Sequence, residues 1–155
     1  VRWAIQHELP MDIYGSNWES FITDSRYRGK LVPNEILSEL YGSSGLVICD
    51  HWEDMRRLGY VSNRLFDVLA SGGRLVIDRV AGLLDLVPER FITIYDTEQD
   101  FVSILKDKTP INYDLRVEAG QWVAEHHSFD VRAREISDRI HLCLSPAHRG
   151  IVYQC

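Results

Sequence analysis

The stretch over residues 59–78 constrains the fold of this chain more than any other part of the sequence. Residues 63–70 have the apolar spacing of a short helix, and three apolar residues share one face of it: Leu65, Phe66 and Leu69. Ser62 or Asn63 is expected to cap this helix, because either side chain can accept a hydrogen bond from a free backbone N–H. The stretch therefore begins with a short amphipathic helix.

The helix is flanked by two apolar runs that each end in an acid. The first run, residues 46–49, ends in Asp50, and the second, residues 75–77, ends in Asp78. The glycine-rich turn 71–73 stops the helix before the second run, because glycine tolerates a left-handed helix terminus. Strand, polar loop, helix and strand in this order make half of a doubly wound parallel sheet.

The rest of the chain continues this alternation. Strands are expected at residues 11–14, 29–32, 46–49, 75–77 and 91–95. Helices are expected at residues 2–8, 33–41, 63–70, 83–86, 97–105 and 115–127, and from 128 or 130 to 144. No Asn-Gly hairpin signal is present. The sequence therefore predicts one α/β domain over residues 1–155, with a Rossmann-like parallel sheet of about five strands and helices on both faces.

Composition excludes several classes of protein. The formal net charge of -6 argues against a general nucleic-acid or membrane-surface binder, and no apolar run is long enough to span a membrane. No signal peptide is visible, and the odd count of three cysteines favours a reducing compartment, so we expect a cytoplasmic location. Cys49 lies in an apolar run and is expected to be a buried thiol. The chain starts without Met, and we expect it to be part of a longer protein.

The sequence does not indicate a metal site. Its cysteines lack the close spacing of metal ligands. His126 and His127 are adjacent, and adjacent residues point in different directions on a helix, so a shared metal is not expected.

Two segments that follow expected strands are candidates for ligand binding. Residues 50–59 form a long connection that contains His51 among acids and bases, which indicates either a ligand-binding loop or a solvated surface loop. Gly15 and Ser16 follow the first strand, where glycine either lets the backbone approach a ligand or makes a simple turn. Free N–H groups at the start of the 63–70 helix would face the same crevice and suit a phosphate.

Five motifs occur in an order and spacing that resemble one family. They are Val32-Pro-Asn-Glu-Ile-Leu, Leu40-Tyr41, Asp50-His51-Trp52, Gly59-Tyr-Val-Ser-Asn-Arg-Leu-Phe-Asp-Val-Leu-Ala and His127-Ser-Phe-Asp-Val-Arg-Ala. They resemble the C-terminal, donor-binding domain of GT-B glycosyltransferases, and most of all the spore maturation protein B-like branch of the glycosyl transferases group 1 family. The resemblance covers residues 11–140, and its most specific string is Ser-Asn-Arg-Leu-Phe-Asp.

The resemblance implies a site for a nucleotide-diphosphate sugar. The donor-binding residues that it implies are Gly15, Ser16, His51, Ser62, Asn63, Arg64 and Asp67. Arg64 would add a charged, bidentate contact to the diphosphate, and Asp67 would accept hydrogen bonds from the ribose hydroxyls. In retaining members of related families a glutamate contacts the sugar. Its position falls on Gly59 here, so His51, Trp52 and Glu53 are possible substitutes.

The resemblance also implies a reaction, the transfer of a sugar, hexosyl in type, from the nucleotide diphosphate to an unidentified acceptor. The acceptor would bind a second Rossmann-like domain that lies outside this chain, so the isolated chain should be inactive or nearly so. No metal and no cofactor is expected, and the catalytic residues stay unassigned.

Alternatives stay open at this point. One is a non-enzymatic Rossmann-like module that binds a nucleotide or assembles with partners. A dinucleotide oxidoreductase is disfavoured, because the Gly-x-Gly-x-x-Gly fingerprint is absent after the first strand. Asp67 alternatively lies in solvent, and Arg64 alternatively pairs with Glu53. The motif at residues 127–130 is expected to cap the last helix and to pack Phe129.

Overall fold

The computed structural model describes residues 1–23, 25–29 and 31–144 of the chain. Its strands are β1 (Ile13–Tyr14), β2 (Tyr27–Gly29), β3 (Val47–Cys49), β4 (Leu75–Asp78) and β5 (Ile92–Tyr95). Its helices are α1 (Arg2–Gln6), α2 (Asn34–Ser43), α3 (Glu53–Leu58), α4 (Arg64–Ala70), α5 (Leu83–Leu86), the 3-10 turn η1 (Glu89–Phe91), α6 (Glu98–Lys106), α7 (Tyr113–His127) and α8 (Phe129–Leu144). The predicted α/β class is confirmed.

Within the described residues, the five parallel strands are divided between two sheets. The larger sheet has the order β3-β4-β5, with Val47 opposite Leu75 and Leu75 opposite Ile92. β1 pairs with β2 alone, and the pair ends at glycines with positive φ, 128° at Gly15 and 147° at Gly29. Such a backbone leaves the region that strands occupy, so this ladder stops after two or three residues. The number and direction of the strands agree with the prediction, but a single continuous sheet does not form.

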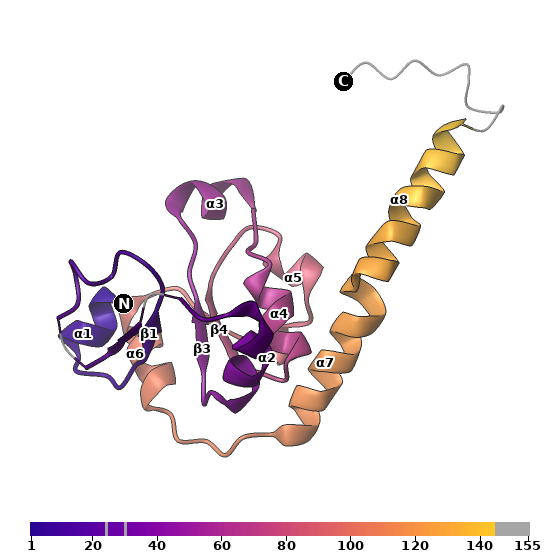
Figure 1. Ribbon diagram of the computed structural model, residues 1–155. Coiled ribbons are helices and arrows are strands. Elements are labelled where there is room, and N and C mark those ends of the chain that lie inside the picture. The colour runs from indigo at the N-terminus through magenta and orange to yellow at the C-terminus, as the bar shows by residue number, and fades with distance from the viewer. Residues whose placement is uncertain (24, 30, 145–155) are drawn as a thin grey trace.

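β4 is the central strand of the larger sheet, and all four of its residues are buried. Leu75 and Ile77 join the core cluster that α4 and α7 also enter, whereas Val76 joins Phe101 of α6 in a second cluster. Figure 1 shows α4 and α7 on one side of this sheet and α1 and α6 on the other. The predicted Rossmann-like arrangement, with helices on both faces, is therefore present around β3, β4 and β5.

Helix α4 has the apolar face that the sequence predicts. Leu65 and Leu69 are buried, Val68 is buried beside them, and Phe66 packs against the same core cluster. The turn after α4 contains Gly72 in the left-handed region at a φ of 68°. The predicted glycine stop is confirmed, and it returns the chain directly to the start of β4.

The connection between β3 and α4 differs from the expected loop, because residues 53–58 of it form helix α3. Glu53 pairs with Arg56, and Asp54 pairs with Arg57, each across three residues. Gly59 ends the helix with a φ of 71°. Acids in the first turn, bases in the last turn and a left-handed glycine all stabilise a short helix, and these local signals outweigh the loop-like composition.

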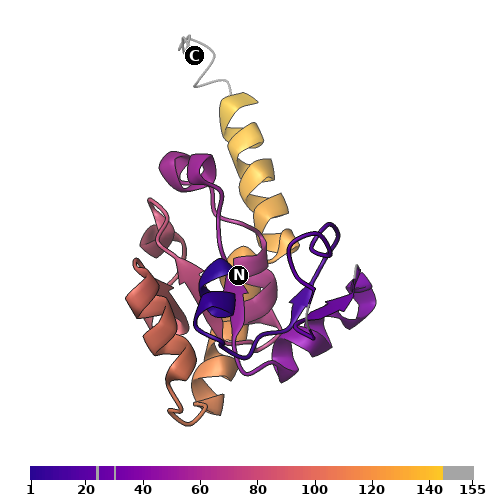
Figure 2. The ribbon, with the colours of Figure 1, turned by 90° about the vertical axis from the view of Figure 1, so that its left-hand side faces the viewer.

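The start of α8 confirms one expectation and contradicts another. Ser128 caps the helix, since its Oγ accepts a hydrogen bond from the Val131 N–H at 3.4 Å. Phe129 does not pack, because 94% of its surface is exposed. His127 packs instead, with its ring stacked on Phe66 at a centroid distance of 4.5 Å. Figures 1 and 2 show why: α8 runs on from α7 and away from the sheet, so its first residue already leaves the core.

We expect Gly73→Ala to lower the free energy of unfolding by about 1–3 kcal/mol, as overpacking a core does. A Cβ at this position would lie 2.7 Å from Val68 Cγ1 and 2.9 Å from the Tyr41 carbonyl oxygen. Gly45→Ala is the matched control, because a Cβ there meets nothing within 4 Å. Urea unfolding of both variants and the parent measures the difference. Equal stability of the two variants would contradict this close approach of α2 and α4.

Candidate functional site

The carboxyl ends of β3, β4 and β5 lie at one edge of the sheet, because the three strands are parallel. The segments that follow them bring Asp50 and His51, Arg79, and Asp96 to this edge. Figure 1 shows α3 beyond the same edge. Open α/β sheets bind their ligands in the crevice outside the carboxyl ends of the strands, so this edge is the candidate site.

His51 lies inside this edge and not on its surface. None of its side chain is exposed, and its Nδ1 lies 2.6 Å from Asp78 Oδ1. Its backbone N–H donates to Asp78 Oδ2 at 3.2 Å, and its Nε2 accepts from the Ser62 N–H at 2.9 Å. Both ring nitrogens are therefore bound within the protein, and the expected direct contact of His51 with a ligand does not fit this arrangement.

Asp78 is the partner that the sequence analysis did not assign. It is buried at the end of β4, and Arg56 of α3 approaches its second oxygen, with Nε and Oδ2 3.8 Å apart. The signal was present in the sequence, since an acid that closes a fully apolar run ends up at the edge of the sheet. The pairing with His51 depended on the register of two strands.

The start of α4 offers fewer free N–H groups than expected. The Ser62 N–H is taken by His51, and the Arg64 N–H points at Ser62 Oγ at 3.3 Å. Asn63 is the N-cap residue, but its side chain makes no capping bond. The Asn63 N–H has no partner in the described part of the chain. One backbone donor at this helix start is thus available to a ligand.

Two exposed charged side chains stand on the first turn of α4. Arg64 and Asp67 are both exposed, and neither side chain forms a hydrogen bond or an ion pair within residues 1–23, 25–29 and 31–144. The alternative partner for Arg64, Glu53, is bound to Arg56. Residues three apart on a helix are neighbours, so the two side chains can act on one ligand.

Residues 2–138 of the chain match a family model described as glycosyl transferase-like. This chain belongs to the glycosyl transferase-like family. The match supports the predicted glycosyltransferase group 1 type of domain. No curated protein and no solved structure matches the chain.

Gly59 of this glycosyl transferase-like domain cannot be replaced by a longer side chain without strain. Its φ is 71°, and a Cβ would lie 3.0 Å from the Ala81 carbonyl oxygen. A glutamate at this position would therefore be strained in this backbone. Of the suggested substitutes, Trp52 is 82% exposed beside the edge, whereas the Glu53 side chain is bound to Arg56.

Gly15 and Ser16 belong to the smaller sheet. The Gly15 N–H donates to the Gly29 carbonyl at 3.1 Å, and its own carbonyl accepts from the Tyr27 hydroxyl at 3.1 Å. Ser16 is exposed. No hydrogen bond within the described residues joins Gly15 or Ser16 to α4, and their place in the donor site stays a prediction.

Burial raises the pKa values of two groups beneath the edge, the Cys49 thiol and the Tyr95 hydroxyl. Cys49 is fully buried, and burial raises the pKa of its thiol to about 11, against the opposing influence of the nearby Arg64 charge. Burial and the carboxylates of Asp78 and Asp50 hold the pKa of Tyr95 above its usual range. Both groups therefore stay protonated near neutral pH. The expectation of a buried thiol at Cys49 is confirmed.

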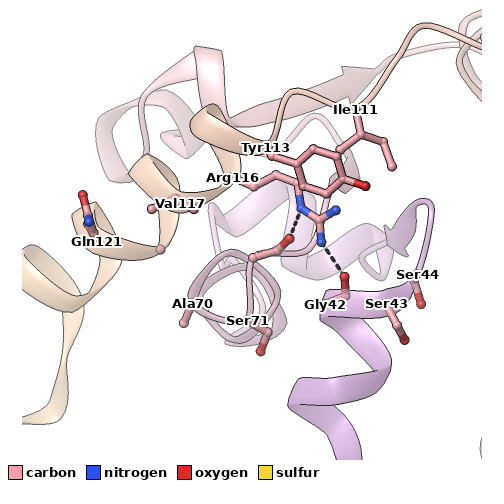
Figure 3. Close-up of a pocket in the computed structure, with 12 residues that line it drawn as sticks. Gly42, Ser43, Ser44, Ala70, Ser71, Ile111, Tyr113, Arg116, Val117 and Gln121 are labelled. Carbon is pink, nitrogen blue, oxygen red and sulfur yellow. Dashed lines mark hydrogen bonds between the residues drawn. The ribbon is translucent and has the colours of Figure 1, made fainter.

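A hollow of about 590 Å³ lies at the opposite end of α4, away from the carboxyl edge (Figure 3). Its floor contains Arg116, which donates to the carbonyl oxygens of Gly72 and Gly42 at the ends of two helices. Helix C-termini carry partial negative charge, and the cation here is already bound to them. This hollow is thus less suited to an anionic ligand than the start of α4.

Two further features concern only the described part of the chain. No three His, Cys, Asp or Glu side chains in it gather closely enough to hold a metal ion. None of its helices combines the length and apolar character needed to cross a bilayer.

We expect Cys49 to resist alkylation while Cys143 reacts. Cys143 is exposed, whereas Cys49 is buried with a raised pKa, so its reactive thiolate is scarce at pH 8. Iodoacetamide labelling followed by peptide mass spectrometry distinguishes the two residues. The same labelling in guanidinium is the control, and there both should react. Equal labelling of the folded protein would contradict the burial of Cys49.

Proposed function

We propose that this chain is the donor-binding half of a GT-B glycosyltransferase, and that it binds a nucleoside diphosphate sugar at the carboxyl edge of β3 and β4. The observation that carries this proposal is the pair formed by the Arg64 guanidinium and the Asn63 N–H, neither of which has a partner among the described residues. Both donors stand at the start of one helix, where the peptide dipoles also favour an anion. Membership of a glycosyl transferase-like family supports the same assignment.

Arg64 has the chemistry that a leaving diphosphate requires. Its planar guanidinium can bind two phosphate oxygens at once, and such charge-assisted pairs are stronger than neutral hydrogen bonds. Negative charge grows on the leaving diphosphate as the sugar bond breaks, so a fixed cation there lowers the barrier. This stabilisation needs neither a metal nor a cofactor.

Asp67 would then bind the ribose. It lies one helical turn after Arg64, and its carboxylate, which has no partner among the described residues, can accept hydrogen bonds from two neighbouring hydroxyls. Trp52 and the turn at Gly15 and Ser16 would complete the donor site once the second, acceptor-binding domain is present. That domain would supply the catalytic base, so the isolated chain should bind the donor without turning it over.

The main alternative is a module that binds nucleotides without catalysis. It would use the same residues, and the family match favours glycosyl transfer over it. A hexosyl donor, a cytoplasmic location and the absence of nucleic-acid partners belong to this proposal as further expectations.

We expect a nucleoside diphosphate to bind more tightly than the matching monophosphate, because the second phosphate adds contacts to Arg64 and the Asn63 N–H. Isothermal titration calorimetry of UDP, GDP, ADP, CDP and dTDP, each against its monophosphate, tests this. Equal affinities for the two members of every pair would remove the diphosphate from the carboxyl edge.

We expect Arg64→Ala to weaken diphosphate binding by about 10- to 100-fold, since hydrogen bonds to charged groups contribute about 1.5–3 kcal/mol. Arg64→Lys should recover part of the loss, because lysine cannot bind two oxygens in parallel. The exposed Arg57, which pairs with Asp54 on α3, gives the matched control Arg57→Ala. Calorimetry and thermal melting of the same samples separate binding from folding. A normally folded Arg64→Ala protein with unchanged affinity would exclude this role.

A further inference from the structure

The buried imidazole of His51 stands between a carboxylate and a backbone amide. Asp78 Oδ1 lies 2.6 Å from Nδ1, and the Ser62 nitrogen lies 2.9 Å from Nε2. Asp78 is on β4, His51 follows β3, and Ser62 precedes α4. One ring therefore connects three segments that are 11 and 27 residues apart in sequence.

The two contacts determine where the ring hydrogen lies. A backbone N–H can only donate, so Nε2 must be an acceptor and must carry no hydrogen. The remaining ring hydrogen is then on Nδ1, where it donates to the Asp78 carboxylate. A carboxylate that accepts from one ring nitrogen makes the other a better acceptor, as second-shell acids do for metal-binding histidines.

We propose that Asp78 and His51 form a hydrogen-bonded relay that orients the Ser62 amide and thereby positions the start of α4 for its ligand. Both are positioning residues, because neither side chain has a free polar atom to offer a ligand. The Ser62 N–H is bound to the ring, whereas the next amide, that of Asn63, has no partner among the described residues and Arg64 is exposed. The relay itself follows from contacts within the chain, whereas its effect on nucleotide affinity rests on the proposed function.

Burial makes each hydrogen bond of this relay costly to lose. The His51 side chain is fully buried and that of Asp78 is 7% exposed, so water does not replace a lost partner. A buried donor or acceptor without a partner costs far more than an exposed one. The Ser62 segment is thus held at one point, while the side chains of Asn63 and Arg64 remain exposed.

Two amide variants separate the two contacts of the ring. His51→Gln carries an acceptor to the region of Nε2 and so keeps a partner for the Ser62 N–H, but it loses the ring donor to Asp78. His51→Asn is shorter, so its amide can donate to Asp78 but cannot reach Ser62. Both replace the ring with an uncharged amide, which makes each the control for the other. His7→Asn, at an exposed histidine that pairs with Glu98, reports any general effect of the substitution.

The first measurement uses the unaltered chain and needs no ligand. Long-range ¹H–¹⁵N correlation spectra should show a neutral His51 ring with hydrogen on Nδ1 and none on Nε2. Hydrogen exchange should show a protected Ser62 amide, and its exchange should accelerate about tenfold or more in His51→Asn but less than threefold in His51→Gln, the difference expected for one lost hydrogen bond. A ring with hydrogen on Nε2 would overturn the relay even if neither variant folds.

The second measurement is the dissociation constant of the diphosphate that the unaltered chain binds best among UDP, GDP, ADP, CDP and dTDP. We expect it to rise about tenfold in His51→Asn and less than threefold in His51→Gln. If His51 only stabilises the fold, the variant with the lower melting temperature should also have the lower affinity, whether that variant is His51→Asn or His51→Gln. That outcome would overturn the positioning role. Failure of all five diphosphates to bind the unaltered chain would refute the proposed function instead, and the ring hydrogen and the Ser62 amide would still test the relay.

Discussion

The buried hydrogen bonds from Asp78 through His51 to Ser62 are the interaction on which the carboxyl edge of this domain depends. They join the ends of two strands to the start of a helix. Buried polar groups are tolerated only when they are paired, and no buried side-chain nitrogen or oxygen in the described residues lacks a partner. Shifting this segment of the chain would leave an imidazole or a carboxylate unpaired in the interior, so the edge keeps one arrangement.

Apolar packing of β4 fixes the position of Asp78, the first member of this chain of hydrogen bonds. β4 is buried on both faces, and its three apolar residues alternate between the two core clusters. This packing fixes β4 along its own axis, so Asp78 at its end has one position at the edge of the sheet. The other end of α4 is held by the close approach at Gly73 and by the hydrogen bonds from Arg116 to the carbonyls of Gly72 and Gly42. Helix α4 is thus held at both ends, by one hydrogen bond to a buried ring before its start and by steric contact and the Arg116 hydrogen bonds after its end.

The charged side chains around the carboxyl edge differ in whether they already have a partner. Around it, Glu53 and Arg56 neutralise each other, and Arg79 forms a forked pair with Asp96. Arg64 has no such partner among the described residues, whereas Arg116 at the far end of α4 is bound to carbonyl groups. Arg64 at the start of the helix can therefore pair with an anion, whereas Arg116 near the hollow of Figure 3 already binds carbonyl groups. The hollow has the volume, but the exposed Arg64 has the charge that a diphosphate requires.

The sequence by itself determined the parallel α/β class, the apolar face of α4 and its glycine stop, because these follow from spacing and backbone freedom within a few residues. It also contains the signals for α3, since the acids, the bases and Gly59 favour a short helix where the composition alone predicts a loop. Only the tertiary structure decided that the strands form two sheets, that His51 points inward, and that Asp78 is its partner. The physical reason is distance along the chain: His51 and Asp78 are 27 residues apart, and only the pairing of β3 with β4 brings them to 2.6 Å.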